Sequence, residues 1–309
     1  MVSKVSEMYR GTSMPAKLAR RTVSMARRAA TGNSTVVLDA IYRAILQRAP
    51  DANAMRDYLP VLRAGEISVE QIGRRLIESD EFSRHSGSRD LGISLHRSRC
   101  DFVRSLPRAK KILDLGGTNL LHEYGAMVVM GYPYSFDEIV IVDLLPEDRH
   151  PNYDLGGVHS EVETGLGTVR YAYHSMSDLT RYEDESFDLV YSGQSIEHIT
   201  LTEGDVMLQE SLRVLRPGGW LAVDTPNSRV TRLQQEEFID PDHKYEYSVD
   251  ELRQKIILSG FEIFEEKGLN LATRCLESGE FSSEEVASHA GLYAEIDDCY
   301  LMAFVCRKP

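Results

Sequence analysis

The chain of 309 residues has few cysteines, and none of them suggests a metal site. It contains four, and no two are spaced as Cys-x-x-Cys. Without that spacing the sequence gives no signal for zinc, and unpaired cysteine most often acts as a small buried apolar residue. We therefore predict free thiols, no zinc site and a reducing, cytoplasmic compartment.

Basic charge is also scarce. Lys and Arg number 35 against 48 Asp and Glu, which gives a net charge of −13 at pH 7. A surface that binds a nucleic-acid duplex needs an excess of Lys and Arg. We therefore expect no nucleic-acid partner.

Residues 1–35 depart from this acidic balance. They hold seven basic side chains and a single acid, Glu7, without the continuous apolar stretch of a signal peptide or a membrane span. Three interpretations of this basic N-terminal tail stay open: a solvated tail, a helix in peripheral contact with a membrane, or an organellar presequence.

Two common nucleotide-binding signatures are missing. No Gly-Lys-[Ser/Thr] sequence marks a phosphate-binding loop. Nicotinamide cofactors need Gly-x-Gly-x-x-Gly with an acid about 20 residues further on. Here Thr118 replaces the second glycine, and the next strand-ending acid, Asp143, lies too far along the chain. What is present is a buried strand, 111–115, that runs into Gly116-Gly117, and this predicts a nucleoside-type cofactor at the carboxyl ends of parallel strands.

The chain is predicted to divide near residue 85. Apolar residues recur at helical spacing over 36–84, which indicates a small all-α domain. Ser68–Gln71, and later Ser248–Glu251, are capping-box patterns. Over 85–309 helical patterns alternate with strands, so we predict an α/β fold with a doubly wound, seven-stranded, mostly parallel sheet and a late antiparallel strand. The expected strands are 112–115, 139–143, 168–173, 187–192, 219–224, 261–265 and 299–306.

A series of motifs over about residues 95–309 resembles the class I S-adenosylmethionine-dependent methyltransferases of the methyltransferase-11/23 type. In chain order the motifs are Ile112–Gly116, Asp143, Ser177–Leu179, Ser186–Ser192 followed by Glu197-His198, Arg213–Gly219, Asp224–Asn227 and Gly260–Glu262. Each motif alone is weak, but their order and spacing are specific. The resemblance implies a Rossmann-like methyltransferase fold that uses S-adenosylmethionine and releases S-adenosylhomocysteine.

The resemblance also implies the cofactor contacts. Asp143 would accept hydrogen bonds from the ribose, Asp178 from the adenine amine, and Leu179 would pack on the ring, while Asp188 would be structural. The predicted cofactor-binding residues are Asp114, Gly116, Gly117, Thr118, Asn119, Asp143, Leu144, Ser177, Asp178, Leu179, Ser192 and Gln194. The family usually has glycine where Thr118 and Asn119 stand. Either this loop is remodelled, with Asn119 adding a polar contact, or the site has lost catalysis.

An oxygen acceptor needs a general base. His243, in the loop after the fifth strand, and His198, directly after the fourth, are the candidates, although a structural role is open for each. A magnesium ion that activates the acceptor is a further alternative. Oxygens for it are available from Asp224, Asn227, Asp240 and Asp242, but their spacing is not diagnostic, so no metal ligand is assigned.

The acceptor class depends on the helical region. Residues 36–84 resemble a small helical domain of unknown function that is appended to bacterial glycan enzymes, although an arbitrary helical cap is an equal alternative. We therefore expect a cytoplasmic, bacterial O-methyltransferase of glycan biosynthesis, acting on a sugar hydroxyl of a glycan, glycolipid or nucleotide-sugar. The alternatives are a small-molecule or natural-product O- or N-methyltransferase and a non-catalytic cofactor-binding or scaffold module. Glycan-biosynthesis enzymes or a second copy of the chain are the open partners.

Overall fold

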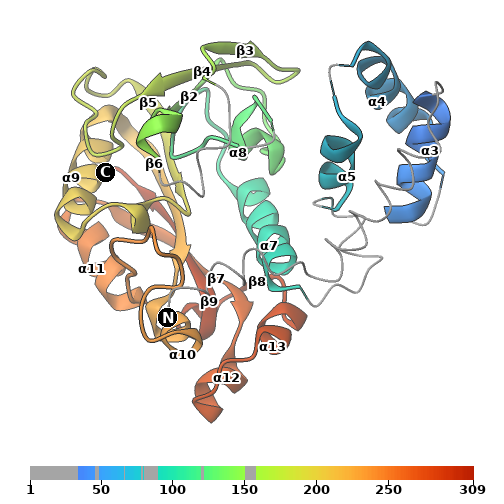
Figure 1. Ribbon diagram of the computed structural model, residues 1–309. Coiled ribbons are helices and arrows are strands. Elements are labelled where there is room, and N and C mark those ends of the chain that lie inside the picture. Colours follow the sequence, from blue (N-terminus) through green and yellow to red (C-terminus); the bar gives the residue numbers. More distant parts are fainter. Residues whose placement is uncertain are drawn as a thin grey trace. The chain divides into compact units, whose positions relative to one another are not determined.

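Figure 1 shows a computed structural model of the chain, which describes residues 34–45, 49–65, 67–77, 79, 90–119, 122–149 and 158–309. The basic tail lies outside the described residues up to residue 33, as do residues 80–89 and 150–157. The chain divides into two compact units, Met1–Ile93 and Ser94–Pro309.

The described part of the first unit contains helices α3 (Ser34–Ile45), α4 (Ala52–Ala64) and α5 (Val69–Ile77). Their apolar faces share one core, formed by Val37, Leu38, Ile41, Tyr42, Ile45, Ala54, Ile67, Ile72 and Leu76. The predicted capping box before α5 is confirmed: Gln71 N donates to Ser68 Oγ (3.2 Å), and Ser68 N donates to Gln71 Oε1 (2.7 Å).

The second unit contains a single sheet, which has nine strands among the described residues rather than the predicted seven. Its order is β3-β4-β2-β1-β5-β6-β9-β7-β8. The strands are β1 (Lys111–Leu115), β2 (Glu138–Asp143), β3 (Glu161–Glu163), β4 (Thr168–Tyr173), β5 (Phe187–Gly193), β6 (Leu215–Pro226), β7 (Glu262–Leu271), β8 (Leu292–Tyr293) and β9 (Cys299–Arg307).

The predicted fold class is confirmed. Strands β4, β2, β1, β5 and β6 run parallel, and β9 is the late antiparallel strand, inserted between β6 and β7. The strand count is wrong because β3 and β8, at the two edges of the sheet, are three and two residues long. Segments of that length are too short to leave a recognisable alternation of apolar residues.

Helices cover both faces of the sheet (Figure 1). Helices α7 (Leu91–Ser105) and α8 (Gly125–Val129) lie on one face, and α9 (Leu201–Val214) and α11 (Val249–Leu258) lie on the other. The remaining helices and 3-10 turns are α10 (Ser228–Gln234), α12 (Thr273–Ser278), α13 (Ser283–Ser288), η1 (Pro146–Asp148), η2 (Ile196–His198) and η3 (Ile296–Asp298). No helix of the described residues is long and apolar enough to cross a membrane.

The order of the strands places a ligand site at the carboxyl end of β1. From β1 the chain continues to β2 on one side, and it later returns to β5 on the other. A reversal of this kind leaves a crevice beyond the carboxyl ends of the strands. At the opposite end of the sheet, Asp188 is structural, as predicted: Lys110 N and Lys111 N donate to its Oδ2 at 2.7 and 2.9 Å. All four cysteines are buried thiols.

Candidate active site

The turn after β1 needs both of its glycines. Gly116 has a φ of +75°, and a Cβ there would lie 2.6 Å from the Cβ of Ser195. A Cβ on Gly117 would lie 2.1 Å from Asp114 Oδ2. Real Cβ atoms do not approach other atoms this closely, so the turn excludes any other residue unless its neighbours move. The predicted glycine turn is present, and it packs against Ser195, which lies just after β5.

Asp114 is a buried carboxylate without a complete set of partners. Its side chain is 1% exposed, and its Oδ2 has no hydrogen-bond partner among the described residues. Burial, together with the nearby carboxylate of Asp143, raises the pKa of Asp114 to about 7, and the guanidinium of Arg99 opposes this rise. A buried carboxylate with an unpaired oxygen is stabilised by a cationic group. This atom therefore suits the positive end of a ligand.

Asp143 ends β2 beside the same turn. Its Oδ1 accepts from Leu144 N (2.7 Å), and its Oδ2 accepts from Thr118 N (3.3 Å). These contacts bring together three of the predicted cofactor residues. Arg149, which sequence reasoning did not select, also forms an ion pair with Asp143 Oδ1 (3.3 Å).

Thr118 and Asn119 do not strain the turn. Among described residues other than glycine, only Glu185, Gln194 and Asn270 have a positive φ, so neither position requires glycine. Thr118 Oγ1 instead accepts from Arg149 Nη2 (3.4 Å). Asn119 forms an isolated β-bridge with His122. The backbone at these two positions therefore accommodates side chains other than glycine.

A network of polar groups centred on Asp224 joins α7, β5 and β6. Asp224 Oδ1 accepts from Arg99 Nε (2.8 Å) and from Gln194 Nε2 (3.0 Å), and its Oδ2 accepts from the Tyr191 hydroxyl (2.6 Å). Gln194 was predicted to contact the cofactor. Arg99 and Tyr191 were not predicted, because each comes into contact with Asp224 only when the chain folds. The pKa of Tyr191 is raised by burial and by the Asp224 carboxylate.

Ser192, also a predicted cofactor residue, is fully buried within the sheet. Its hydroxyl bonds to that of Ser195 (2.7 Å), which in turn donates to Leu115 O (2.7 Å). These contacts link the ends of β1 and β5. In the structure Ser192 therefore fixes the shape of the turn.

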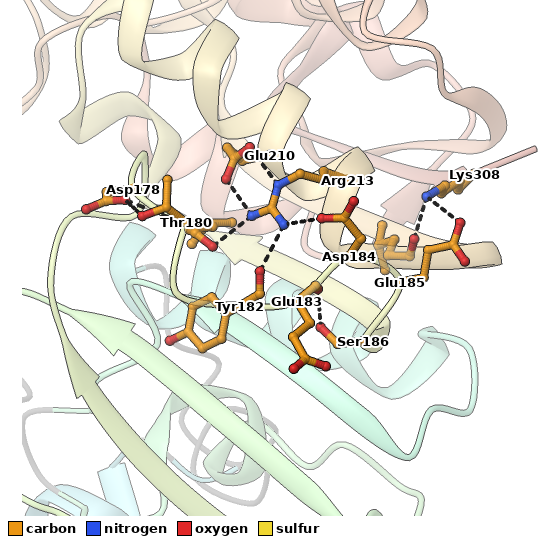
Figure 2. Close-up of polar contacts among 12 residues, drawn as sticks. Asp178, Thr180, Tyr182, Glu183, Asp184, Glu185, Ser186, Glu210, Arg213 and Lys308 are labelled. Atoms are coloured by element: carbon orange, nitrogen blue, oxygen red, sulfur yellow. Dashed lines mark hydrogen bonds and ion pairs between the residues drawn. The ribbon is translucent and has the colours of Figure 1, made fainter.

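The segment Ser177–Leu179 follows β4, and Figure 2 shows the contacts of Asp178 within it. The Asp178 carboxylate is exposed and accepts from Thr180 N (3.3 Å) and Oγ1 (2.6 Å), and these bonds lower its pKa. Ser177 Oγ bonds to Ser175 Oγ (2.8 Å). The side chain of Leu179 is completely buried in the core. Met176, which sequence reasoning missed, is closer to the glycine turn: its Cε would lie 3.7 Å from a Cβ on Gly116.

Arg213 anchors this loop to α9 (Figure 2). Its Nη1 donates to Tyr182 O (2.9 Å), and its Nη2 donates to Leu179 O (2.8 Å). The guanidinium also pairs with Asp184 (2.6 Å) and Glu210 (2.7 Å). One side chain therefore connects both ends of the segment that follows Asp178.

The two candidate bases, His198 and His243, lie together. Their rings meet edge to face, with centroids 4.8 Å apart. His198 Nδ1 bonds to Asp242 Oδ2 (3.0 Å), and His243 Nδ1 bonds to Glu246 Oε1 (2.7 Å). Hydrogen bonding to Glu246 and the charge of Glu197 raise the pKa of His243, although its burial acts in the opposite direction.

Glu197 completes this cluster. Its carboxylate is buried, and Oε2 accepts from Thr225 Oγ1 (2.9 Å). Burial raises its pKa, and the two histidines oppose that rise. One ligand atom from each of Glu197, His198 and His243 lies within 4.8 Å of the other two, the one such group of three or more His, Cys, Asp or Glu side chains in the described part of the chain.

The four side chains considered as magnesium ligands form hydrogen bonds within the protein. Asp224 is bonded to Arg99, Tyr191 and Gln194 as described above. Asn227 donates to the backbone of Asp297 and Cys299 and accepts from Arg229 N at the start of α10. Asp240 accepts from Asp242 N (2.9 Å), and Asp242 bonds to His198. Asp224, Asp240 and Asp242 do not form a group of metal ligands among the described residues.

Comparison with known proteins gives two sequence matches. Residues 137–223 match the family model of a methyltransferase domain. A curated Mycolicibacterium smegmatis protein, named as an S-adenosylmethionine-dependent methyltransferase, is 35% identical over 86 residues, which are 28% of this chain and 33% of that protein. The chain thus spans about a third of that relative. These matches support an S-adenosylmethionine-dependent methyltransferase and, with it, S-adenosylmethionine as the cofactor.

Similar solved structures include two S-adenosylmethionine-dependent methyltransferases. The protein from Thermotoga maritima is 17% identical, with 70% of this chain and 92% of that chain covered and a TM-score of 0.47. The protein from Methanosarcina mazei is also 17% identical, with 67% and 96% covered and a TM-score of 0.42.

Proposed function

We propose that the chain is an S-adenosylmethionine-dependent O-methyltransferase that acts on a sugar hydroxyl of a bacterial glycan, glycolipid or nucleotide-sugar. The observation that carries the cofactor assignment is the buried, partnerless oxygen of Asp114 beside the Gly116-Gly117 turn. S-adenosylmethionine carries an ammonium and a sulfonium, so its charge complements this carboxylate. The residues present therefore fit the cofactor.

Asp143 has the second role in cofactor binding. It ends the strand next to β1, and a carboxylate at that position can accept hydrogen bonds from both hydroxyls of a ribose. Its present contacts with Thr118 N and Leu144 N hold the carboxylate in place. Arg149 neutralises part of its charge.

Oxygen as the acceptor atom is supported by the histidine pair. When the methyl group of a sulfonium moves to a hydroxyl, the hydroxyl must lose its proton, whereas a neutral amine attacks through its lone pair. His198 and His243, each oriented by a carboxylate, are suited to promote that proton loss. The sugar class is supported by the resemblance of residues 36–84 to a domain found on glycan enzymes.

Calorimetry with S-adenosylhomocysteine tests the cofactor assignment. We expect one product molecule to bind per chain, and Asp143→Ala to abolish that binding. Asp137→Ala is the matched control, since Asp137 precedes the same strand at its other end and forms an exposed ion pair with Lys110. A wild-type chain that binds neither cofactor nor product would refute the proposal.

The acceptor is tested separately, by the formation of S-adenosylhomocysteine with panels of nucleotide-sugars, glycolipids and amines. Turnover with a sugar hydroxyl supports the proposal. Turnover restricted to amines would replace the O-methyltransferase with an N-methyltransferase, and cofactor binding without any turnover would favour a non-catalytic module.

A further inference from the structure

We propose that Glu197, His198 and His243 bind a divalent transition-metal ion that activates the acceptor hydroxyl. The proposal deepens the proposed methyl transfer and depends on it for the role of the ion. It also departs from the sequence-based expectation, which assigned no metal ligand and treated His198 and His243 as candidate bases.

The set of ligands is suitable for such an ion. One carboxylate and two imidazoles occur together in catalytic zinc sites and in non-haem iron sites, where further coordination positions stay open. Metal bonds to these atoms are about 2.0–2.2 Å long, so bound ligand atoms lie about 3–4 Å apart. The ligand atoms here all lie within 4.8 Å of one another, and small side-chain rotations close the difference.

Each of the two imidazoles forms the kind of hydrogen bond to a carboxylate that metal-binding histidines form with their second ring nitrogen. A histidine ligand almost always donates its second ring N–H to a carboxylate or carbonyl, which fixes the tautomer and the ring orientation. His198 Nδ1 meets Asp242, and His243 Nδ1 meets Glu246. In that arrangement the second nitrogen of each ring, Nε2, would coordinate the ion. Glu246 is itself fixed by Thr231 Oγ1 (2.6 Å) and Ile239 N (2.8 Å).

The buried carboxylate of Glu197 favours a cation at this point. Glu197 is 1% exposed, and a buried ionised carboxylate is unfavourable unless it is paired. Thr225 Oγ1 donates to one of its oxygens, and this contact orients the group. A divalent ion would supply the positive charge that a single hydroxyl donor does not.

The two segments that carry the ligands are joined by backbone hydrogen bonds. Lys244 N and Tyr245 N both donate to Glu197 O, at 2.8 and 3.2 Å. The loop that bears His243 is thereby fixed to η2, which bears Glu197 and His198. A site held by such contacts is assembled before the ion arrives.

The position of the cluster relates the ion to methyl transfer. Glu197 lies two residues after Ser195, whose side chain lies against the glycine turn at the carboxyl end of β1. An ion held there would coordinate the acceptor oxygen and lower the pKa of its hydroxyl. The hydroxyl proton passes to water, and the oxygen then forms a bond to the methyl carbon. The carbon–sulfur bond breaks at the same time, and its electron pair stays on sulfur.

Titration of the full-length chain with Co²⁺ alone, after treatment with a chelator, tests the site directly. The d–d absorption of Co²⁺ reports its ligands and does not require turnover. We expect one ion per chain with nitrogen and oxygen ligands, and competition by Zn²⁺. His198→Ala, His243→Ala and Glu197→Gln should each weaken binding at least 100-fold, and Asp242→Asn about 10–100-fold.

His289→Ala is the matched control, because His289 also faces a carboxylate, Glu285, but lies outside the cluster. It should bind Co²⁺ like the wild type. Binding of S-adenosylhomocysteine in the presence of chelator verifies that each variant is folded.

The outcomes separate the two proposals. If the chain binds S-adenosylhomocysteine but no Co²⁺, the metal site is refuted and the proposed function stands. Co²⁺ binding that survives all three ligand substitutions also refutes the site. If Co²⁺ binds at the cluster but neither cofactor nor product binds, the metal site stands and the methyltransferase proposal is refuted.

Discussion

The imidazole rings of His198 and His243 meet edge to face at a centroid distance of 4.8 Å, although one follows β5 and the other belongs to the loop before α11. The relationship depends on the Glu197 carbonyl, which accepts hydrogen bonds from the backbone of that loop. It brings two histidine–carboxylate pairs to the same edge of the sheet as the glycine turn. The proposed acceptor chemistry depends on this meeting more than on either histidine alone.

Asp114 should make the stability of the fold depend on pH. Its pKa in the folded chain, about 7, lies above its ordinary value of 3.8, so the folded state binds the proton more tightly than the unfolded state does. Its contribution to the free energy of unfolding is therefore complete below pH 4 and is lost as the pH rises to 7. The loss should be about 1.4 kcal/mol per pH unit over that window.

Urea unfolding at pH 5, 6, 7 and 8 measures this contribution. The test is the difference between the wild type and Asp114→Asn, which keeps the shape of the side chain but cannot ionise. Other titrating groups largely cancel in that difference. We expect the wild type to lose stability relative to the variant between pH 5 and 7, and parallel profiles would contradict the raised pKa.

Binding of the product should show the opposite dependence on pH. Ionised Asp114 attracts the ammonium group of S-adenosylhomocysteine, so affinity should increase as the pH rises toward 7 and then level off. Below pH 7 the affinity should change by at most about tenfold per pH unit. Calorimetry between pH 5.5 and 8.5 measures the effect, and Asp114→Asn should flatten it. An affinity independent of pH in the wild type would place the ammonium group elsewhere.

Gly117→Ala should damage the turn even though its backbone conformation is accessible to alanine. The added Cβ would lie 2.1 Å from Asp114 Oδ2, in a buried place where the carboxylate has little room to move. We expect a loss of about 1–3 kcal/mol in unfolding free energy, as for other overpacked sites, and weaker binding of S-adenosylhomocysteine.

Gly165→Ala is the control for that substitution, because a Cβ there meets nothing within 4 Å. Its unfolding free energy should stay within about 0.5 kcal/mol of the wild type. If both alanine variants behave alike, the close approach of Asp114 to the turn is wrong.

The sequence predicted those features that local patterns encode. Strands β1, β2, β4 and β5 lie within one residue of their expected bounds, because each is an apolar segment bounded by turn residues. The capping box at Ser68–Gln71 is complete. At Ser248–Glu251 only the bond from Glu251 N to Ser248 Oγ forms, since the Glu251 side chain bonds to the Tyr245 hydroxyl instead. A tertiary contact there outweighed a local one.

Much of the candidate site could not be predicted in this way. Arg99 meets Asp224 from a helix before β1, and Arg149 meets Asp143 after a turn without a distinctive pattern. His243 was selected as an isolated histidine, but its partnership with His198 and Glu197 exists only in the folded chain. Pairings of this kind depend on strand order, which brings distant residues to one edge and leaves no periodic signal.

Arg213→Ala should loosen the loop that carries Asp178. The guanidinium donates to the carbonyls of Leu179 and Tyr182, and both would lose their charged partner (Figure 2). Hydrogen bonds to a charged group contribute about 1.5–3 kcal/mol each, and partial exposure of Arg213 reduces that, so we expect a total loss of about 2–3 kcal/mol in unfolding free energy.

Asp184→Ala is the matched control, because it removes one partner of the same guanidinium and leaves both carbonyl contacts intact. Asp184 is 74% exposed, and exposed ion pairs contribute at most about 1 kcal/mol. Urea unfolding gives the two losses, and hydrogen exchange of the amides of residues 178–182 locates them. Rapid exchange there should appear in Arg213→Ala alone. Equal losses in the two variants would mean that the ion pair, and not the carbonyl contacts, holds the loop.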